Sequence, residues 1–219
     1  LELRAGQRVL DLGAGTGEFA KAVAHRADRP KRLSITSVDY VGEGLARGRE
    51  RFVTLPNTSG ISTCHIVANL ELGAVHHLPV APGEFHAVLA SLLISYLRDP
   101  EQLLIQIRDL LRPGGRLVVS TPRRDADLSK IYVDGMAELQ PDRVRELFGG
   151  AGELRFDVLQ RQFLNSGERL LALEEAGRFR FWDAWELARL VRLAGFRSVR
   201  TQPAFGDPPQ VIVLSARRP

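Results

Sequence analysis

The sequence contains a single cysteine, Cys64, among its 219 residues. An internal disulfide and a zinc site built from several cysteines are therefore excluded. Long apolar runs are also missing, because the longest, residues 87–97, is much shorter than the roughly 20 residues that a membrane-spanning helix needs. These absences predict a reduced, cytoplasmic setting and no membrane insertion.

A large excess of charge of one sign is missing as well. The 30 basic and 26 acidic side chains leave a formal net charge of +4, and no block of five basic residues occurs. A nucleic-acid-binding tail is therefore not indicated. The composition, 44% hydrophobic and 26% charged, is that of a globular protein. The length suits one domain, or one domain with an insertion.

No signal or transit peptide is visible, because an expected strand begins within a few residues of Leu1. Since the first residue is not methionine, we expect either that upstream residues were trimmed or that the chain is fused to an upstream domain.

Short apolar stretches alternate with amphipathic ones along the chain. Strands are expected at 8–12, 33–38, 63–68, 85–90, 116–120, 197–201 and 211–215. Helices are expected at 18–26 and 45–53, although Gly44 and Gly48 weaken the second. Two further helices have clear N-caps, Asp99 and Asp183. The apolar face of the helix after Asp99 is expected to reach Leu111, and residues 113–115 to end the helix.

Strands that alternate with helices predict an α/β three-layer sandwich with a mostly parallel, seven-stranded sheet. The short connection at 206–209 favours an antiparallel pair at the C-terminus. The segment 122–181 is longer than an ordinary connection, and we expect it to hold helices, for instance at 128–139 and 142–148. The predicted organisation is one domain formed by 1–121 and 182–219, with a helical insertion at 122–181.

A glycine-rich turn follows the first expected strand, with the sequence Gly-Ala-Gly-Thr-Gly at 13–17. The dinucleotide fingerprint G-x-G-x-x-G has its third glycine one position later. Glu18 stands where a pyrophosphate would approach, and a Walker A lysine is missing. A nicotinamide cofactor is therefore disfavoured by both spacing and charge.

With its neighbours, this turn resembles the first motif of the class I S-adenosylmethionine-dependent methyltransferases, particularly those that act on small molecules. The matching segments are 9–17 (Val-Leu-Asp-Leu-Gly-Ala-Gly-Thr-Gly), Asp39 after the second strand, 78–79 with 85–91, 110–117 and 193–196. They follow the family's order and cover nearly the whole chain except the insertion. The resemblance implies a Rossmann-like fold, S-adenosylmethionine as cofactor and S-adenosylhomocysteine as product.

The resemblance also implies specific cofactor contacts. Asp11 would reach the ammonium group, Asp39 would accept both ribose hydroxyls, and Tyr40 would lie on the adenine. Asn69 would accept a hydrogen bond from the adenine amino group, although another alignment with the family's pattern places Ala74 and Val75 at this position. The expected cofactor-binding residues are Asp11, Gly13, Ala14, Gly15, Gly17, Asp39, Tyr40, Asn69, Leu70, Ser91 and Leu92. Purely structural alternatives are a tight turn at 13–17, a helix cap at Asp39 and a core position for Tyr40.

No catalytic base stands out in the sequence. His76, His77 and Tyr96 are weak candidates; the two histidines point in opposite directions on an extended chain, so at most one faces a cleft. A solvated loop is the alternative for the histidines, and a core position for Tyr96. Ser95, Tyr96 and Tyr132 are expected to contact the substrate. The histidine pair has no third ligand nearby, so no metal site is expected.

The expected function is methyl transfer from S-adenosylmethionine to a small organic acceptor covered by the insertion, with the acceptor atom left open. The Asn-Pro-Pro-Tyr type of motif found in enzymes that modify nucleic-acid amino groups is absent. The eight residues before the first motif have no counterpart of the helices that precede it in many relatives and close over the substrate. Two alternatives stay open: a protein or RNA methyltransferase, and a non-catalytic domain that binds the cofactor or its product within a larger protein.

Overall fold

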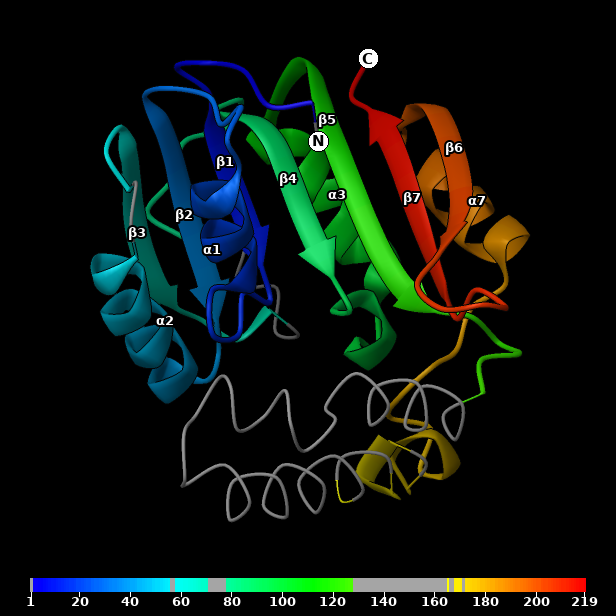
Figure 1. The fold of residues 1–219 in the computed structure, drawn as a ribbon. Helices are drawn as coiled ribbons and strands as arrows, with labels where there is room; N and C mark the ends of the chain where they lie inside the picture. The colour runs from blue at the N-terminus through cyan, green and yellow to red at the C-terminus, as the bar shows by residue number, and fades with distance from the viewer. Residues whose placement is uncertain (1, 56–57, 71–77, 128–164, 166–167, 171) are drawn as a thin grey trace.

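The computed structural model describes residues 2–55, 58–70, 78–127, 165, 168–170 and 172–219. Seven strands form a single sheet with helices on both faces (Figure 1). The strands are β1 (Arg8–Leu12), β2 (Leu33–Asp39), β3 (Ile61–Val67), β4 (Phe85–Ser91), β5 (Leu111–Pro122), β6 (Arg197–Ala204) and β7 (Val211–Arg217). The named helices are α1 (Glu18–His25), α2 (Gly42–Thr54), the 3-10 turn η3 (Ile94–Tyr96), α3 (Pro100–Leu110) and α7 (Ala184–Leu193).

The strand order is β3-β2-β1-β4-β5-β7-β6. The strands from β3 to β5 pair in parallel, whereas β7 runs antiparallel to both β5 and β6. The order reverses between β1 and β4, and in such sheets the crevice at this reversal, outside the carboxyl ends of the strands, is where ligands bind. The expected mostly parallel sheet with an antiparallel C-terminal strand is confirmed.

The two faces of the sheet bury different side chains of the same strands. Val9 packs in a cluster with residues of α1 and α2, whereas its neighbour Leu10 packs with residues of α3 and α7. Figure 1 shows α1 and α2 on one face and α3 and α7 on the other. The near-continuous apolar sequence of β1 follows from this arrangement, because both faces of a parallel sheet are covered.

The two expected helix caps are present. The Asp99 side chain accepts a hydrogen bond of 3.0 Å from the backbone N–H of Gln102, and Pro100 occupies the first turn of α3. At α7, Glu186 accepts from the backbone N–H of Asp183 at 3.5 Å and completes a capping box. These contacts satisfy N–H groups that have no partner within the helix.

The junction between α3 and β5 differs from the sequence prediction. Leu111 was expected on the apolar face of the helix, but α3 ends at Leu110 and Leu111 already pairs with Phe85 in the sheet. The next paired residues are Ala87 and Arg116, so 112–115 bulge out of the ladder. The glycines there bend the strand instead of ending the helix, because a bulge accommodates the extra residues without breaking the sheet.

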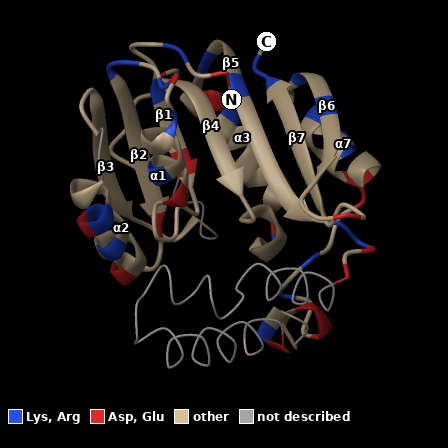
Figure 2. Cartoon of the chain, in the orientation of Figure 1, with Lys and Arg blue, Asp and Glu red and all other residues tan. Residues whose placement is uncertain are grey.

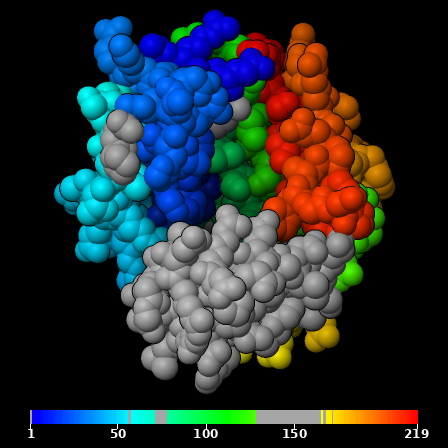
Figure 3. Space-filling model, viewed as in Figure 1, coloured from blue at the N-terminus to red at the C-terminus, as the bar shows by residue number. Residues whose placement is uncertain are grey.

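The N-terminal residues lie beside the C-terminal strand, at the end of the sheet opposite the carboxyl ends of β1–β5 (Figures 1 and 3). There Glu2 pairs with Arg116 and lies 3.9 Å from Arg217. None of the described helices is long and apolar enough to cross a membrane. The helices expected at 128–139 and 142–148 lie outside the described residues.

Candidate cofactor and acceptor site

A cavity of about 880 Å³ lies at the carboxyl ends of β1, β2 and β4, where the strand order reverses. The turn after β1 and the segments after β2, β3 and β4 form most of its wall. Arg169, Leu173 and Arg178 face it from the segment that precedes α7. The lining residues are Asp11, Gly13, Ala14, Gly15, Thr16, Glu18, Phe19, Asp39, Tyr40, Ala68, Asn69, Leu70, Leu89, Ser91, Leu92, Leu93, Tyr96, Leu97, Arg98, Arg169, Leu173 and Arg178.

Asp39, the last residue of β2, organises the wall of this cavity. Its Oδ2 accepts a hydrogen bond of 2.9 Å from the backbone N–H of Gly15, and its Oδ1 accepts one of 2.9 Å from that of Val41. Each carboxylate oxygen can accept a further bond. A ligand with two adjacent hydroxyls, such as a ribose, could therefore bind Asp39 without displacing either backbone contact.

Glycines are needed both in the turn after β1 and in the helix that packs against it. Gly13 and Gly15 have φ values of +70° and +53°, in the left-handed region that other residues rarely adopt. The turn also lies against α2, where a Cβ placed on Gly48 would be 2.8 Å from the carbonyl oxygen of Thr16. In the sequence, Gly48 only weakened the expected helix; in the structure it lets α2 approach the turn.

Asp11 is buried beneath the turn, with 2% of its surface exposed. Its Oδ2 has no hydrogen-bond partner among the described residues. Burial, and to a lesser degree the negative charge of Asp39, raise the pKa of Asp11 to about 7. A cationic group bound beside Asp11 would stabilise its ionised form and supply the missing partner. The ammonium group of S-adenosylmethionine fits this requirement, so the residues present suit that cofactor.

The structure brings most of the expected cofactor-binding residues to this cavity. Ala14, Asn69, Leu70, Ser91 and Leu92 all line it, and so does Tyr40. Tyr40 is 69% exposed, so it is not a core residue.

Two expected residues lie outside the lining. Gly17 is the N-cap of α1. Ser95 is buried, and its hydroxyl lies 2.6 Å from that of Thr121 in a hydrogen bond between η3 and β5. Ser95 therefore does not line the cavity in which a substrate was expected to contact it. The prediction came from chain position alone, which did not show which way the side chain points.

Tyr96 lines the cavity and packs edge-on against Phe179, with ring centres 4.8 Å apart. Partial burial raises the pKa of its hydroxyl, so the phenol is protonated at neutral pH and can donate a hydrogen bond. His76, His77, Tyr132, Ala74 and Val75 lie outside the described residues. Among the described residues, no group of three or more His, Cys, Asp or Glu could hold a metal ion.

Three arginines in the lining were missed by the sequence analysis: Arg98, Arg169 and Arg178. Arg98 follows η3, whereas Arg169 and Arg178 precede α7, about seventy and eighty residues later in the chain. The path of such a long connection cannot be predicted from the sequence. No spacing rule links such positions, so only the fold could show that they face one cavity.

Comparison with known proteins identifies the family of this chain. A family model described as a methyltransferase domain matches residues 1–201. The chain is 30% identical over 119 residues to the ubiquinone/menaquinone biosynthesis C-methyltransferase UbiE of Geotalea daltonii, covering 53% of this chain and 47% of that protein. It is 28% identical over 169 residues to an O-methyltransferase of Pyrenophora dematioidea, covering 76% of this chain and 55% of that protein.

A solved structure of an S-adenosylmethionine-dependent methyltransferase from Thermotoga maritima has the same fold. The TM-score is 0.56 at 19% identity, over 99% of this chain and 84% of that one. The chain spans between a third and about half of the length of the curated relatives that it matches. Because the family model covers more than nine-tenths of the sequence, the chain belongs to the methyltransferase-domain family of S-adenosylmethionine-dependent methyltransferases.

Proposed function

We propose that this chain transfers a methyl group from S-adenosylmethionine to a small organic acceptor. The observation that carries the proposal is the pair of acidic side chains, Asp11 and Asp39, at the reversal point of the sheet. Asp11 lacks a partner that a cation would supply, and Asp39 has capacity for a diol. When bound, S-adenosylmethionine supplies a methyl group on a sulfonium that needs no further activation.

In this proposal the described residues bind and orient the cofactor. Asp39 holds the ribose hydroxyls, and Asp11 holds the ammonium group directly or through water. The glycine turn lets the backbone pass close to the methionine part. Tyr40 offers a face to the adenine, and Asn69 an acceptor for its amino group. The contribution to catalysis is mainly alignment of the acceptor with the methyl group, together with exclusion of water.

The acceptor would occupy the part of the cavity beside Tyr96. Tyr96, packed against the buried Phe179, gives this part an aromatic side chain, and its hydroxyl can donate a hydrogen bond to the acceptor. We propose the insertion at 122–181 as the cover over it. Among the described lining residues there is no histidine, lysine or cysteine. For an acceptor that must lose a proton, either His76 or His77 is the proposed base, whereas a neutral amine needs none.

The setting of the protein is part of the proposal. The single cysteine and the lack of a spanning helix among the described residues support a reduced, cytoplasmic location. Relatives named as C- and O-methyltransferases leave the acceptor atom open.

A thermal-shift titration tests the cofactor assignment. Wild-type protein is titrated with S-adenosylmethionine, S-adenosylhomocysteine and NAD. At a hundred times the dissociation constant, a ligand adds about 2.7 kcal/mol to the stability, which for a domain of this size raises Tm by roughly 5–11 °C. We expect this shift with both adenosyl ligands and none with NAD.

A folded protein that responds to neither adenosyl ligand would contradict the proposal. A positive shift justifies a screen of small acceptors with radiolabelled S-adenosylmethionine, with loss of label from the cofactor as the readout. Tight binding of S-adenosylhomocysteine without transfer to any acceptor would favour the non-catalytic alternative.

A further inference from the structure

The cavity separates its charged residues by their sign. Its acidic lining comes from β1, α1 and β2, whereas its basic lining comes from the segment after η3 and from residues 169–178. The acidic residues are Asp11, Glu18 and Asp39, and the basic ones are Arg98, Arg169 and Arg178. The acidic wall is the one proposed above for the cofactor, so Arg169 and Arg178 on the basic wall are positioned for a second molecule.

The segment before α7 turns a basic side chain toward the cavity. Residues 168–170 and 172–175 are helical, and Arg169 and Leu173, four residues apart, both line the cavity. Side chains at this spacing share one face of a helix. Glu168, Glu174 and Glu175 do not line the cavity. Figure 2 shows that the described part of this segment carries both basic and acidic residues. Of these charged residues, only the arginines Arg169 and Arg178 line the cavity.

Arg178 is held beside the aromatic pair of the acceptor region. Its backbone N–H donates to the carbonyl of Leu173 at 2.7 Å, and that of Phe179 donates to the same carbonyl at 3.0 Å. Phe179 is buried against Tyr96. These contacts place the backbone of Arg178 at the end of the helical segment, next to this aromatic pair.

Arg169 and Arg178 form no ion pair with any carboxylate in the part of the chain that the structure describes. Like charges gathered in a cleft repel one another and raise the local concentration of anions. The guanidinium fork matches a carboxylate or a phosphate, because it donates two parallel hydrogen bonds to two oxygens. An anionic ligand would relieve the repulsion and use both forks.

We propose that the methyl acceptor carries a negatively charged group, a carboxylate or a phosphate, which Arg169 and Arg178 bind at the wall of the cavity opposite the glycine turn. Arg98 contributes positive charge to the same wall. The inference rests on the proposed function, because it assigns the substrate class of that site. It also sets the orientation of the acceptor, since anchoring the anion at this wall leaves the rest of the molecule directed toward the cofactor.

The test measures binding to the protein saturated with S-adenosylhomocysteine, by calorimetry at constant ionic strength. The probes are benzoate, phenyl phosphate and benzyl alcohol, which share a ring and differ in their polar group. The two anions distinguish a carboxylate site from a phosphate site, and the alcohol is the neutral control. The double variant Arg169→Gln with Arg178→Gln removes the two guanidinium groups.

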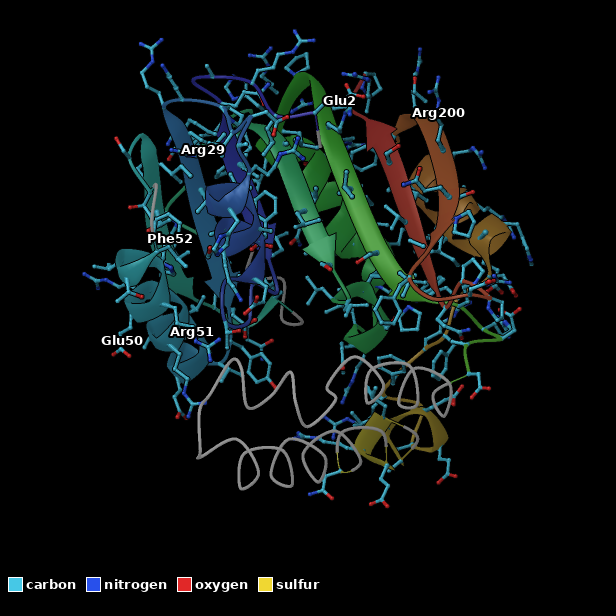
Figure 4. All side chains as sticks on the ribbon, viewed as in Figure 1. Glu2, Arg29, Glu50, Arg51, Phe52 and Arg200 are labelled. Atoms are coloured by element: carbon cyan, nitrogen blue, oxygen red, sulfur yellow. The ribbon has the colours of Figure 1, made fainter. Side chains whose placement is uncertain are left out.

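A matched control removes the same charge elsewhere. Arg189 on α7 and Arg200 on β6 are exposed and do not line the cavity, and Figure 4 shows Arg200 toward the end of β6 away from it. The double variant Arg189→Gln with Arg200→Gln therefore has the same net charge as the test variant. A third variant, Arg169→Lys with Arg178→Lys, keeps the charge but loses the fork.

We expect at least one anion to bind the wild-type complex about tenfold or more tightly than benzyl alcohol, and the glutamine variant to lose about tenfold or more of that affinity. The control variant should match wild type, and the lysine variant should lie between them. Binding of S-adenosylhomocysteine, titrated first, should be the same in all four proteins.

Several results would overturn the proposal. One is equal binding of the alcohol and the anions, and another is an unchanged anion affinity in the glutamine variant. The lack of saturable binding of either anion would count against it equally. A parallel loss of affinity for S-adenosylhomocysteine would assign the arginines to the cofactor's own carboxylate. If wild-type protein bound no S-adenosylhomocysteine, the proposed function itself would fail, and this result is seen before any probe is added.

Discussion

The carboxylate of Asp39 accepts a hydrogen bond of 2.9 Å from the backbone N–H of Gly15, which ties the end of β2 to the turn after β1. The same carboxylate is the group proposed to hold the ribose. One side chain therefore shapes the turn and presents acceptors to the ligand. Stability without ligand and affinity for the cofactor should consequently respond together when Asp39 is changed.

Replacing Asp39 by alanine should lower both the stability of the ligand-free protein and its affinity for the cofactor. The backbone N–H groups of Gly15 and Val41 lose their acceptor, which costs about 1–3 kcal/mol where a buried donor is left unpaired. The Tm shift produced by S-adenosylhomocysteine should disappear. Thermal unfolding with and without the ligand measures both effects.

Asp28→Ala is the control for Asp39→Ala. Asp28 is an exposed carboxylate that pairs with Arg26 at 2.7 Å and does not line the cavity. This variant should keep the full response to S-adenosylhomocysteine. An Asp39→Ala protein that still showed the wild-type shift would rule out the ribose contact.

Asp11 should make the stability of the ligand-free protein depend on pH. Its pKa is raised from an ordinary value of 3.8 to about 7, so between these values the native state holds a proton that the unfolded chain has released. Stability should therefore fall as pH rises through this window, by at most about 1.4 kcal/mol per pH unit, and change little above pH 7 from this group. Urea unfolding at a series of pH values measures the slope.

The Asp11→Asn variant should lose this part of the pH dependence, because the amide does not titrate. In wild type, affinity for S-adenosylhomocysteine should rise by about tenfold from pH 6 to pH 8, since the ionised carboxylate is the form that holds an ammonium group. Identical pH profiles for wild type and Asp11→Asn would show that Asp11 does not titrate in this range.

Gly48→Ala should destabilise the protein, although glycine-to-alanine changes inside helices usually stabilise by about 1 kcal/mol. The new methyl group would lie 2.8 Å from the carbonyl oxygen of Thr16 and would push α2 away from the glycine turn. A loss of about 1–3 kcal/mol is typical of such overpacking. Urea unfolding and titration with S-adenosylhomocysteine should both show the loss.

Arg47→Ala places an alanine on the exposed side of the same helix, where Arg47 pairs with Glu43 at 2.5 Å. This variant should change the free energy of unfolding by no more than about 0.5 kcal/mol, as for other exposed ion pairs. If Gly48→Ala were as stable as wild type, the close approach of α2 would not matter for the turn.

Ser95→Ala should lower stability without changing ligand affinity. The Ser95 hydroxyl is bonded to that of Thr121 at 2.6 Å, and its loss should cost about 1 kcal/mol. Combining it with Thr121→Val should cost less than the sum of the two single changes, because no unpaired hydroxyl remains. Binding of S-adenosylhomocysteine and of the anionic probes should match wild type. Weaker probe binding by Ser95→Ala would restore Ser95 as an acceptor contact.

Much of the fold could be predicted because the signals are local. The apolar strand 8–12 and the cap at Asp99 each depend on residues that are neighbours in the sequence. The end of α3 could not be predicted, because Leu111 suits the apolar face of a helix and the core side of β5 equally well. Pairing with Phe85 decided between them, and that partner lies 26 residues away in the chain.

The proposed cofactor side of the site was determined largely by the sequence itself, because Asp11, the glycine turn and Asp39 lie at strand ends that a parallel sheet brings to one edge. Only the tertiary structure decided the other wall. It turned Ser95 toward Thr121, packed Gly48 against Thr16, and brought Arg98, Arg169 and Arg178 to one cavity. The physical reason is that a side chain's direction and its distant neighbours depend on how the elements pack, whereas a strand, a turn and a cap depend on adjacent residues.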